Sequence, residues 1–364
     1  MIIGIPKEIK NHEYRVGATP SGVAELIKNN HKVIIENNAG LEIDYCNEQY
    51  KAAGAEIVEN AAQIYENSDL ILKVKEPQEE ECKMIKENQI IFSFLHLAAE
   101  EKLAVNLLKS NCYAIAFETI TANDNTLPLL APMSEVAGKI AVQAGAKALE
   151  KSQGGRGILL GGVPGVNRAN IMILGGGAAG INAAKVAIGM GAKVTILDKS
   201  LARIRYLCDI FGSNADILYS NQQNIIQNIP HSDLIIGSVL IPGASAPKLI
   251  TKEHLKLMQK GTVLVDIAID QGGCFETSRP TTHSDPIFIE NDIVHYCVTN
   301  MPGAVPRTST LALENATLPF TIEIANKGIE KAIAENHHIY NGLNIAHNKI
   351  IHQEVANSLS HIIK

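Results

Sequence analysis

The sequence predicts an α/β fold made of two domains, each a parallel sheet covered by helices. Short apolar segments typical of strands alternate with helical stretches along most of the chain, which is the pattern of parallel sheets. A length of 364 residues is more than one ordinary hydrophobic core supports, so two domains are expected. Two prolines, Pro128 and Pro132, interrupt the alternation and indicate where the first domain gives way to the second.

The first domain is predicted from a series of strands and an early helix. Thr19 suits the N-cap position and Pro20 the first helical position, so a helix is expected from there to about Asn29. The predicted strands are residues 2–5, 32–36, 70–74, 90–95 and 113–118.

The second domain is predicted to begin with a long helix from Ser134 to about Lys151. Ser134 and Glu135 are expected to cap this helix, and Gly154 with Gly155 to end it. The glycine-rich stretch 154–165 predicts a loop. The strands predicted after it are residues 171–174, 194–198, 233–240, 262–269 and 293–298.

Two C-terminal helices are predicted after Pro302 and Pro306, over residues 310–334 and 345–363. They follow the last predicted strand and have no sheet of their own to cover, so we expect them to return to the first domain. The predicted domains are therefore residues 1–128 plus 307–364, and residues 129–306. The fold class expected is α/β, with two doubly wound domains and a cleft between them.

Composition argues against several classes of partner. Lys and Arg number 32 against 38 Asp and Glu, and these charges are scattered, so no basic stripe predicts a nucleic-acid partner. No apolar run approaches the roughly 18 to 20 residues that cross a bilayer, and the N-terminus is not a secretion signal, so no membrane association is expected.

The six cysteines are far apart, and neither they nor the histidines form a metal-ligand pattern. We therefore expect reduced thiols in a cytoplasmic protein and no metal site.

The most informative motif is an apolar strand that runs into Gly175-Gly176-Gly177-Ala178-Ala179-Gly180. In such a loop the first glycine allows a tight turn, the second lets a pyrophosphate approach the backbone, and the third lets the helix pack closely on the sheet. Asp198 ends the next predicted strand, 18 residues beyond Gly180. A carboxylate there accepts hydrogen bonds from ribose hydroxyls and repels a 2′-phosphate, which predicts a Rossmann-like domain that binds NAD rather than NADP.

Chemically capable residues follow several predicted strands, where open α/β sheets bind ligands. Lys75 and His96 follow two strands of the first domain, and Asp270 follows a strand of the second. Arg15 comes from the loop after the first strand. Arg15 and Lys75 suit a small carboxylate, Arg15 with a fork that makes two bonds. His96 suits proton transfer, and Asp270 suits a cationic intermediate, a water or the nicotinamide ribose.

Each of these residues also has a structural interpretation. A lysine at a strand end is commonly solvated, a histidine there is commonly a satisfied structural residue, and an aspartate before two glycines is a common turn former. The joint pattern favours one site for a small carboxylate that uses NAD.

Further stretches carry a resemblance to a known family. They are residues 4–8, 73–77, 95–98, 132–138, 161–166, 242–244, 246–249, 265–276 and 300–310, together with the glycine loop. On these motifs the chain resembles the bacterial alanine dehydrogenase family across essentially its full length.

The resemblance implies that L-alanine, NAD and water give pyruvate, ammonium and NADH, reversibly. It implies that Arg15 and Lys75 bind the substrate, that His96 is the catalytic acid/base and that Asp270 is the second catalytic residue. It also implies a homohexamer and a discontinuous substrate domain. The cofactor contacts it implies, with those of the glycine loop, are Ser134, Gly175, Gly177, Ala178, Gly180, Asp198, Arg203, Ser220, Val239, Leu240, Ile267, Ala268, Ile269, Asp270, Arg279, Val298, Thr299, Asn300 and Met301. Some members have Lys where this chain has Arg203, which keeps the charge.

Two alternatives stay open. The chain also resembles the NAD-binding part of proton-translocating transhydrogenase, which needs no amino-acid pocket and passes hydride to a partner protein. A saccharopine-type dehydrogenase is the other alternative. Lys75 and His96 at strand ends favour the alanine dehydrogenase interpretation over the first of these.

Overall fold

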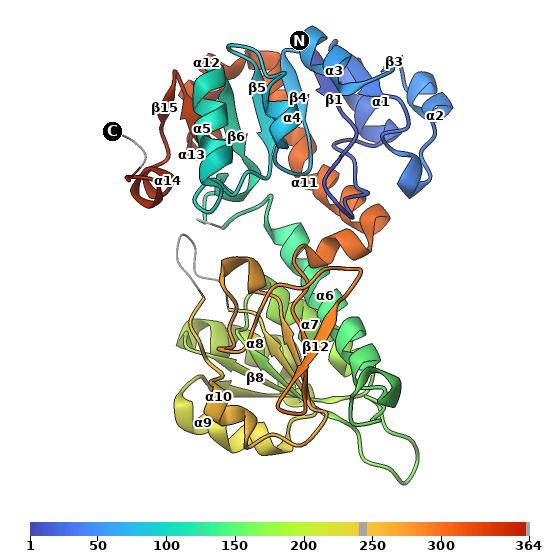
Figure 1. Cartoon of the computed structure of the whole chain (residues 1–364), viewed down its shortest axis with the longest axis vertical. Helices are drawn as coiled ribbons and strands as arrows, with labels where there is room; N and C mark the ends of the chain where they lie inside the picture. Colours follow the sequence, from blue (N-terminus) through green and yellow to red (C-terminus); the bar gives the residue numbers. More distant parts are fainter. Residues whose placement is uncertain (125, 240–245, 362–364) are drawn as a thin grey trace. The chain divides into compact units, whose positions relative to one another are not determined.

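The computed structural model describes residues 1–124, 126–239 and 246–361, and the chain divides into two compact units. Unit 1 comprises Met1–Met133 and Val305–Lys364, and unit 2 comprises Ser134–Ala304. Unit 1 is therefore discontinuous, built from the beginning and the end of the chain (Figure 1). No helix among the described residues is both long enough and apolar enough to span a membrane.

Unit 1 holds a sheet of eight described strands in the order β15-β14-β6-β5-β4-β1-β2-β3. Strands β1 to β6 are parallel, and β14 and β15 are antiparallel additions at one edge. The strands are β1 (Ile2–Ile5), β2 (Lys32–Glu36), β3 (Glu56–Val58), β4 (Leu70–Leu72), β5 (Ile90–Ser93), β6 (Tyr113–Ala116), β14 (Leu343–Ala346) and β15 (Lys349–Ile350). The strand order reverses direction between β1 and β4, as in a doubly wound sheet.

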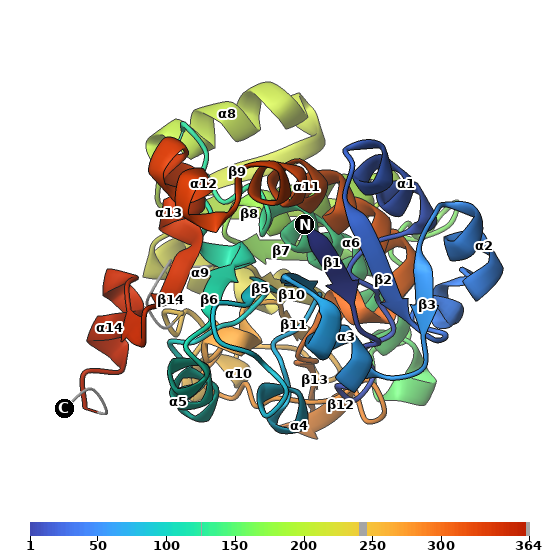
Figure 2. The ribbon, with the colours of Figure 1, turned by 90° about the horizontal axis from the view of Figure 1, so that it is seen from above.

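Helices cover both faces of this sheet, with α1, α11, α12 and α13 on one side and α3, α4 and α5 on the other (Figure 2). The helices of unit 1 are α1 (Pro20–Lys28), α2 (Asn47–Ala52), α3 (Ala61–Asn67), α4 (Glu79–Cys82), α5 (Glu101–Ser110), α11 (Pro306–Lys327), α12 (Ile329–Glu335), α13 (His337–Gly342) and α14 (Gln353–Ser358). One buried carboxylate ties the two chain segments together. Glu314 of α11 accepts hydrogen bonds from the backbone N–H of Thr19 (2.6 Å) and from its hydroxyl (2.7 Å).

The predicted helix over residues 345–363 is wrong in its first half, and only α14 (Gln353–Ser358) is helical in its second half among the described residues. Its first half is the hairpin of β14 and β15, and β14 lies beside β6 (Figure 2). His347 and Asn348 make the turn, with φ angles of 50° and 58°. Positive φ at both central residues is what a type I′ hairpin turn requires, and it stops a helix. The helix predicted over residues 310–334 exists but is broken at Gly328, where φ is 75°.

Unit 2 holds a sheet of seven described strands in the order β12-β13-β11-β10-β7-β8-β9. All are parallel except the edge strand β12. The strands are β7 (Asn170–Leu174), β8 (Lys193–Asp198), β9 (Ala215–Tyr219), β10 (Leu234–Gly237), β11 (Val263–Asp266), β12 (Ile287–Glu290) and β13 (Ile293–Tyr296). The helices are α6 (Ala131–Ala148, which begins in unit 1), α7 (Ala178–Gly189), α8 (Leu201–Phe211), α9 (Gln222–Asn228) and α10 (Lys252–Leu255).

Helix α6 begins at Ala131, so the prediction that Ser134 and Glu135 cap it is wrong. Pro132 lies in the first turn, where a proline is tolerated because its missing N–H has no helical partner anyway. Further along, Gly138 lets α6 cross close to α7, since a Cβ there would lie 2.1 Å from the carbonyl oxygen of Ala179. Ser134 is one turn before Gly138 on the same face of α6.

Candidate functional site

Both sheets present their candidate residues at the carboxyl ends of the parallel strands. The strand order reverses between β1 and β4 in unit 1 and between β7 and β10 in unit 2. Ligands of open α/β sheets bind at such reversals, because the loops of the two neighbouring strands diverge there. The loops after these four strands carry Arg15, Lys75, the glycine motif and Val239.

The glycine motif after β7 has the geometry that a pyrophosphate requires. Gly175 has a φ of 99°, and a Cβ there would lie 2.9 Å from Val239 Cγ2. Gly180 at the start of α7 could not carry a Cβ, which would lie 1.9 Å from the Gly175 carbonyl oxygen. Around Gly177, by contrast, a Cβ would meet nothing within 4 Å among the described residues. Packing therefore requires the first and third glycines, whereas Gly177 faces open space beside the N-terminus of α7, which begins at Ala178.

Asp198 at the end of β8 is fixed by backbone donors. Its Oδ2 accepts a hydrogen bond from Gly176 N–H (2.7 Å), and its Oδ1 accepts one from Ser200 N–H (2.8 Å). The Asp198 carbonyl oxygen accepts from the N–H of Ser220, which follows β9. Arg203 lies in the first turn of α8, with its guanidinium 5.3 Å from the ring centre of Tyr206. The carboxylate is thus held beside the glycine loop, where an adenosine ribose lies in this fold.

The remaining predicted cofactor contacts also follow strands of unit 2, and Leu240 lies outside the described residues. Ile267, Ala268, Ile269 and Asp270 follow β11, and Val298, Thr299, Asn300 and Met301 follow β13. Arg279 packs its guanidinium 4.2 Å from the ring centre of Phe288 in β12. The open space at Gly177 and the acceptor Asp198 fit a dinucleotide with an unphosphorylated ribose.

In unit 1, Arg15 is buried and already paired. Its Nε and Nη2 each donate to Glu13, both at 2.6 Å, and its Nη1 lies 3.2 Å from the sulfur of Met133. The side chains of Glu13 and Arg15 are 0% and 2% exposed. The sequence predicts that the guanidinium fork grips a ligand carboxylate with two bonds, but Glu13 occupies the Nε and Nη2 edge. Nη1, which contacts Met133, is the guanidinium nitrogen that Glu13 does not engage.

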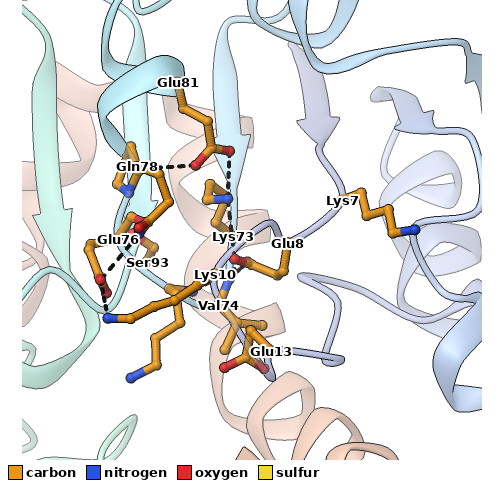
Figure 3. A network of polar contacts seen from close by, with 12 residues as sticks. Lys7, Glu8, Lys10, Glu13, Lys73, Val74, Glu76, Gln78, Glu81 and Ser93 are labelled. Carbon is orange, nitrogen blue, oxygen red and sulfur yellow. Dashed lines mark hydrogen bonds and ion pairs between the residues drawn. The ribbon is translucent and has the colours of Figure 1, made fainter.

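A buried cluster of charged side chains, formed by Glu8, Lys73 and Glu81, holds the backbone that leads to Lys75. Lys73 Nζ lies 3.2 Å from Glu8 Oε2 and 2.7 Å from Glu81 Oε1, and all three side chains are at most 2% exposed (Figure 3). Glu8 Oε1 accepts hydrogen bonds from the N–H groups of Val74 (2.7 Å) and Lys75 (3.3 Å). These N–H groups lie just beyond β4, where the pairing with β1 has ended. The Glu8 carboxylate therefore accepts them in place of a β1 carbonyl oxygen.

Burial sets the ionisation of this cluster. Burial raises the pKa of the Glu8 carboxyl above its ordinary value, although the Lys73 ammonium opposes that shift. Burial by itself would lower the pKa of Lys73, but Glu8 and Glu81 outweigh it and raise that pKa. Lys73 is therefore held as a structural cation, while Lys75 is the lysine that the sequence places in the site.

His96 is held by its backbone. It has a φ of 49°, which is uncommon for a residue with a side chain. Glu118, just after β6, accepts the His96 N–H at 2.6 Å, and its Oε1 lies 3.9 Å from the imidazole Nδ1. The imidazole stacks on Phe94 with ring centres 5.8 Å apart and is 45% exposed. The hydrogen bond to Glu118 helps to hold this left-handed conformation.

The fold of unit 1 brings three of the predicted residues to one edge. Phe94 N–H donates to the Val74 carbonyl oxygen (3.1 Å), so the chain leading to His96 runs beside the chain leading to Lys75. Arg15 follows β1, the neighbour of β4 on its other side. Asp270 belongs to unit 2 and is exposed.

Sequence reasoning missed the acidic partners Glu8, Glu13 and Glu118. Glu8 stands in one of the motifs that carry the family resemblance, which was a signal. The other two carry no signal of their own, since their partners are set by the fold.

The two doubly wound units, one with a glycine loop and an acid on the next strand, define a protein of the Rossmann class. Two family models match the chain: "Alanine dehydrogenase/PNT, N-terminal domain" over residues 4–137 and "Alanine dehydrogenase/PNT, C-terminal domain" over residues 141–353. The chain belongs to the alanine dehydrogenase/PNT family, as the resemblance in its motifs predicts.

Curated relatives match over nearly their whole length. An alanine dehydrogenase of Halomonas elongata is 53% identical over 356 residues, which are 98% of this chain and 96% of the relative. An alanine dehydrogenase of Bacillus subtilis is 51% identical over 362 residues, 99% of this chain and 95% of the relative.

Solved structures match the fold. A structure titled L-alanine dehydrogenase has a TM-score of 0.96 at 44% identity and covers 100% of both chains. A transhydrogenase from Sinorhizobium meliloti has a TM-score of 0.82 at 22% identity, covering 97% of this chain and 99% of that one, and shares the fold. The predicted α/β class with two Rossmann-like domains is confirmed.

Proposed function

We propose that this chain is an NAD-dependent alanine dehydrogenase. It would catalyse the reversible reaction in which L-alanine, NAD⁺ and water give pyruvate, ammonium, NADH and a proton. The observation that carries the proposal is the placement of Arg15, Lys75 and His96 at one sheet edge, in a chain 53% identical to a curated alanine dehydrogenase. A cofactor module would need no such set of carboxylate-binding and proton-transfer groups.

The substrate is assigned to unit 1. Arg15 Nη1 and the Lys75 ammonium bind the carboxylate and the carbonyl oxygen of pyruvate, since both groups donate to anionic or polarised oxygens. His96 acts as acid and base: it takes a proton from the water that adds to the imino carbon and returns a proton to the departing amine. Its partial exposure suits this role, because the imidazole must exchange its proton between cycles.

The cofactor is assigned to unit 2. The N–H groups at the start of α7 face the pyrophosphate, with Gly177 leaving room for it, and Asp198 accepts from the adenosine ribose. NAD, when bound, supplies the acceptor for the hydride of the substrate Cα. Asp270, after β11, is assigned as the second catalytic residue, on the family resemblance.

We further propose a homohexamer, on the family resemblance alone. Light scattering should then report a mass about six times the 39.2 kDa of one chain. A monomeric or dimeric mass would contradict that part of the proposal and leave the catalytic assignment untouched.

The proposed activity is tested by NADH oxidation with pyruvate, run with and without ammonium. Consumption that needs both compounds supports a reductively aminating dehydrogenase. Consumption without ammonium would instead indicate a 2-hydroxy-acid dehydrogenase in which His96 protonates an oxygen. Tight NADH binding with no consumption would favour the transhydrogenase-like module.

A further inference from the structure

The loop that carries Asp270 is clamped from two sides. It runs from the end of β11 through a short helical turn to Gly272 and Gly273, both left-handed, with φ angles of 87° and 79°. Asp270 lies on this turn and is exposed. Among the residues that the structure describes, no side chain donates a hydrogen bond to the Asp270 carboxylate. Its position is therefore set by the backbone of its own loop.

On one side the loop is held by the carboxylate of Asp266. Asp266, the last residue of β11, is 0% exposed and accepts hydrogen bonds from the N–H groups of Ala268 (3.1 Å), Cys274 (2.8 Å) and Phe275 (3.3 Å). The hydroxyl of Ser278 donates to the same carboxylate. The Asp266 side chain thus holds the N–H groups on both sides of the turn. A Cβ on Gly273 would lie 2.5 Å from Asp266 Oδ2, so this approach requires glycine.

On its other side the loop is held by the ammonium group of Lys248, which comes from a separate segment of the chain. Lys248 Nζ donates to the carbonyl oxygens of Gly273 (3.0 Å), Phe275 (3.1 Å) and Gly272. The two left-handed glycines turn their carbonyl oxygens toward this ammonium, and its three N–H donors match three acceptors. Lys248 stands in the motif Ala246-Pro247-Lys248-Leu249, which the proposed catalytic roles do not use.

From these contacts we infer that Lys248 is a positioning residue for the reaction, acting through Asp270. It fixes the carbonyls two to five residues beyond Asp270, and Asp266 fixes the N–H groups on either side of it. The inference rests on the proposed catalytic role of Asp270. A shift of about 1 Å in a reacting group costs as much as a hundredfold in rate, so loss of the cation should be visible in kcat.

The test is a double-mutant cycle on kcat for L-alanine oxidation with Lys248→Met and Asp270→Ala. Met keeps the length of the aliphatic stem, which is exposed, and removes only the donors. We expect K248M to lower kcat roughly tenfold to a hundredfold in the wild-type background and less than about twofold in the D270A background. Lys86→Met is the matched control, because Lys86 also donates to a backbone carbonyl, that of Glu66 in unit 1, and its kcat should stay within about twofold of wild type.

Equal falls in both backgrounds would overturn the inference, since Lys248 would then act on the fold and not through Asp270. An unchanged kcat in K248M would overturn it as well. An unchanged kcat in D270A alone would instead refute the proposed role of Asp270, so the two failures are distinguishable. If K248M does not fold, Lys248→Arg serves in the same cycle: it keeps the charge, but its planar fork does not match three converging carbonyls.

Discussion

Replacing Gly177 by alanine should weaken cofactor binding without harming the fold. Gly177 has a φ of −71° and a ψ of −167°, which alanine adopts freely, and a Cβ there would meet no atom of the described part of the chain within 4 Å. The free energy of unfolding of the ligand-free protein should therefore change by less than about 1 kcal/mol, since the gain from a stiffer unfolded chain offsets a poorer N-cap. The added methyl group fills the space assigned to the pyrophosphate.

We expect the NADH dissociation constant of G177A to rise at least about tenfold, which is about 1.4 kcal/mol of binding free energy. In wild-type protein, NADH at a hundred times its dissociation constant adds about 2.7 kcal/mol to the stability of the folded state, and the same concentration should add only about 1.4 kcal/mol in the variant. Fluorescence titration measures the first quantity, and denaturant unfolding with and without NADH measures the second.

Two other glycines of the same helix serve as controls. Gly189 at the far end of α7 is also open, so G189A should leave both NADH affinity and folding unchanged or slightly improve stability. Gly180→Ala should destabilise the ligand-free protein by about 1–3 kcal/mol or more, because its Cβ would lie 1.9 Å from the Gly175 carbonyl oxygen. The reasoning is refuted if G177A binds NADH as wild type does, or if it unfolds as readily as G180A.

Three further substitutions test separate parts of the account. His96→Ala should lower kcat about a hundredfold or more while thermal unfolding stays unchanged, because the imidazole is half-exposed; near-wild-type turnover would remove its acid/base role. Asp198→Ala should improve the relative use of NADP over NAD in steady-state kinetics, and an unchanged ratio would contradict its assignment. Burial raises the pKa of Glu314 above its ordinary 4.5, so the native state holds that proton more tightly than the unfolded chain. The free energy of unfolding should fall as pH rises from 4.5 through the raised pKa, and Glu314→Gln should flatten that slope in denaturant titrations; an identical slope in both proteins would disprove this.

Much of the fold follows from local sequence signals. The Thr19-Pro20 start of α1 and the predicted strand at residues 2–5 are confirmed, because capping and short apolar runs act locally. Local signals could not predict the C-terminal hairpin, because β14 forms only by pairing with β6, more than 200 residues earlier. Pro132 was ambiguous for a similar reason: a proline breaks a helix interior but fits a first turn, and only the start at Ala131 decides between them.

The sequence predicted where the candidate residues lie in the chain, but not which side chains they contact in the fold. Strand ends locate Lys75 and His96, and the parallel sheet brings them to one edge. Nothing local predicts that Glu13 occupies one edge of the Arg15 guanidinium, or that Glu118 holds the backbone of His96, because these contacts depend on how loops from different strands pack.

The most direct test of the proposed function follows the hydride itself. L-alanine deuterated at Cα is incubated with NAD, and the NADH formed is analysed by mass spectrometry beside the pyruvate and ammonium released. The account predicts NADH that carries one deuterium, with pyruvate and ammonium formed in equal amounts. NADH without deuterium, or no NADH from alanine at all, would contradict the assignment of this chain as an alanine dehydrogenase.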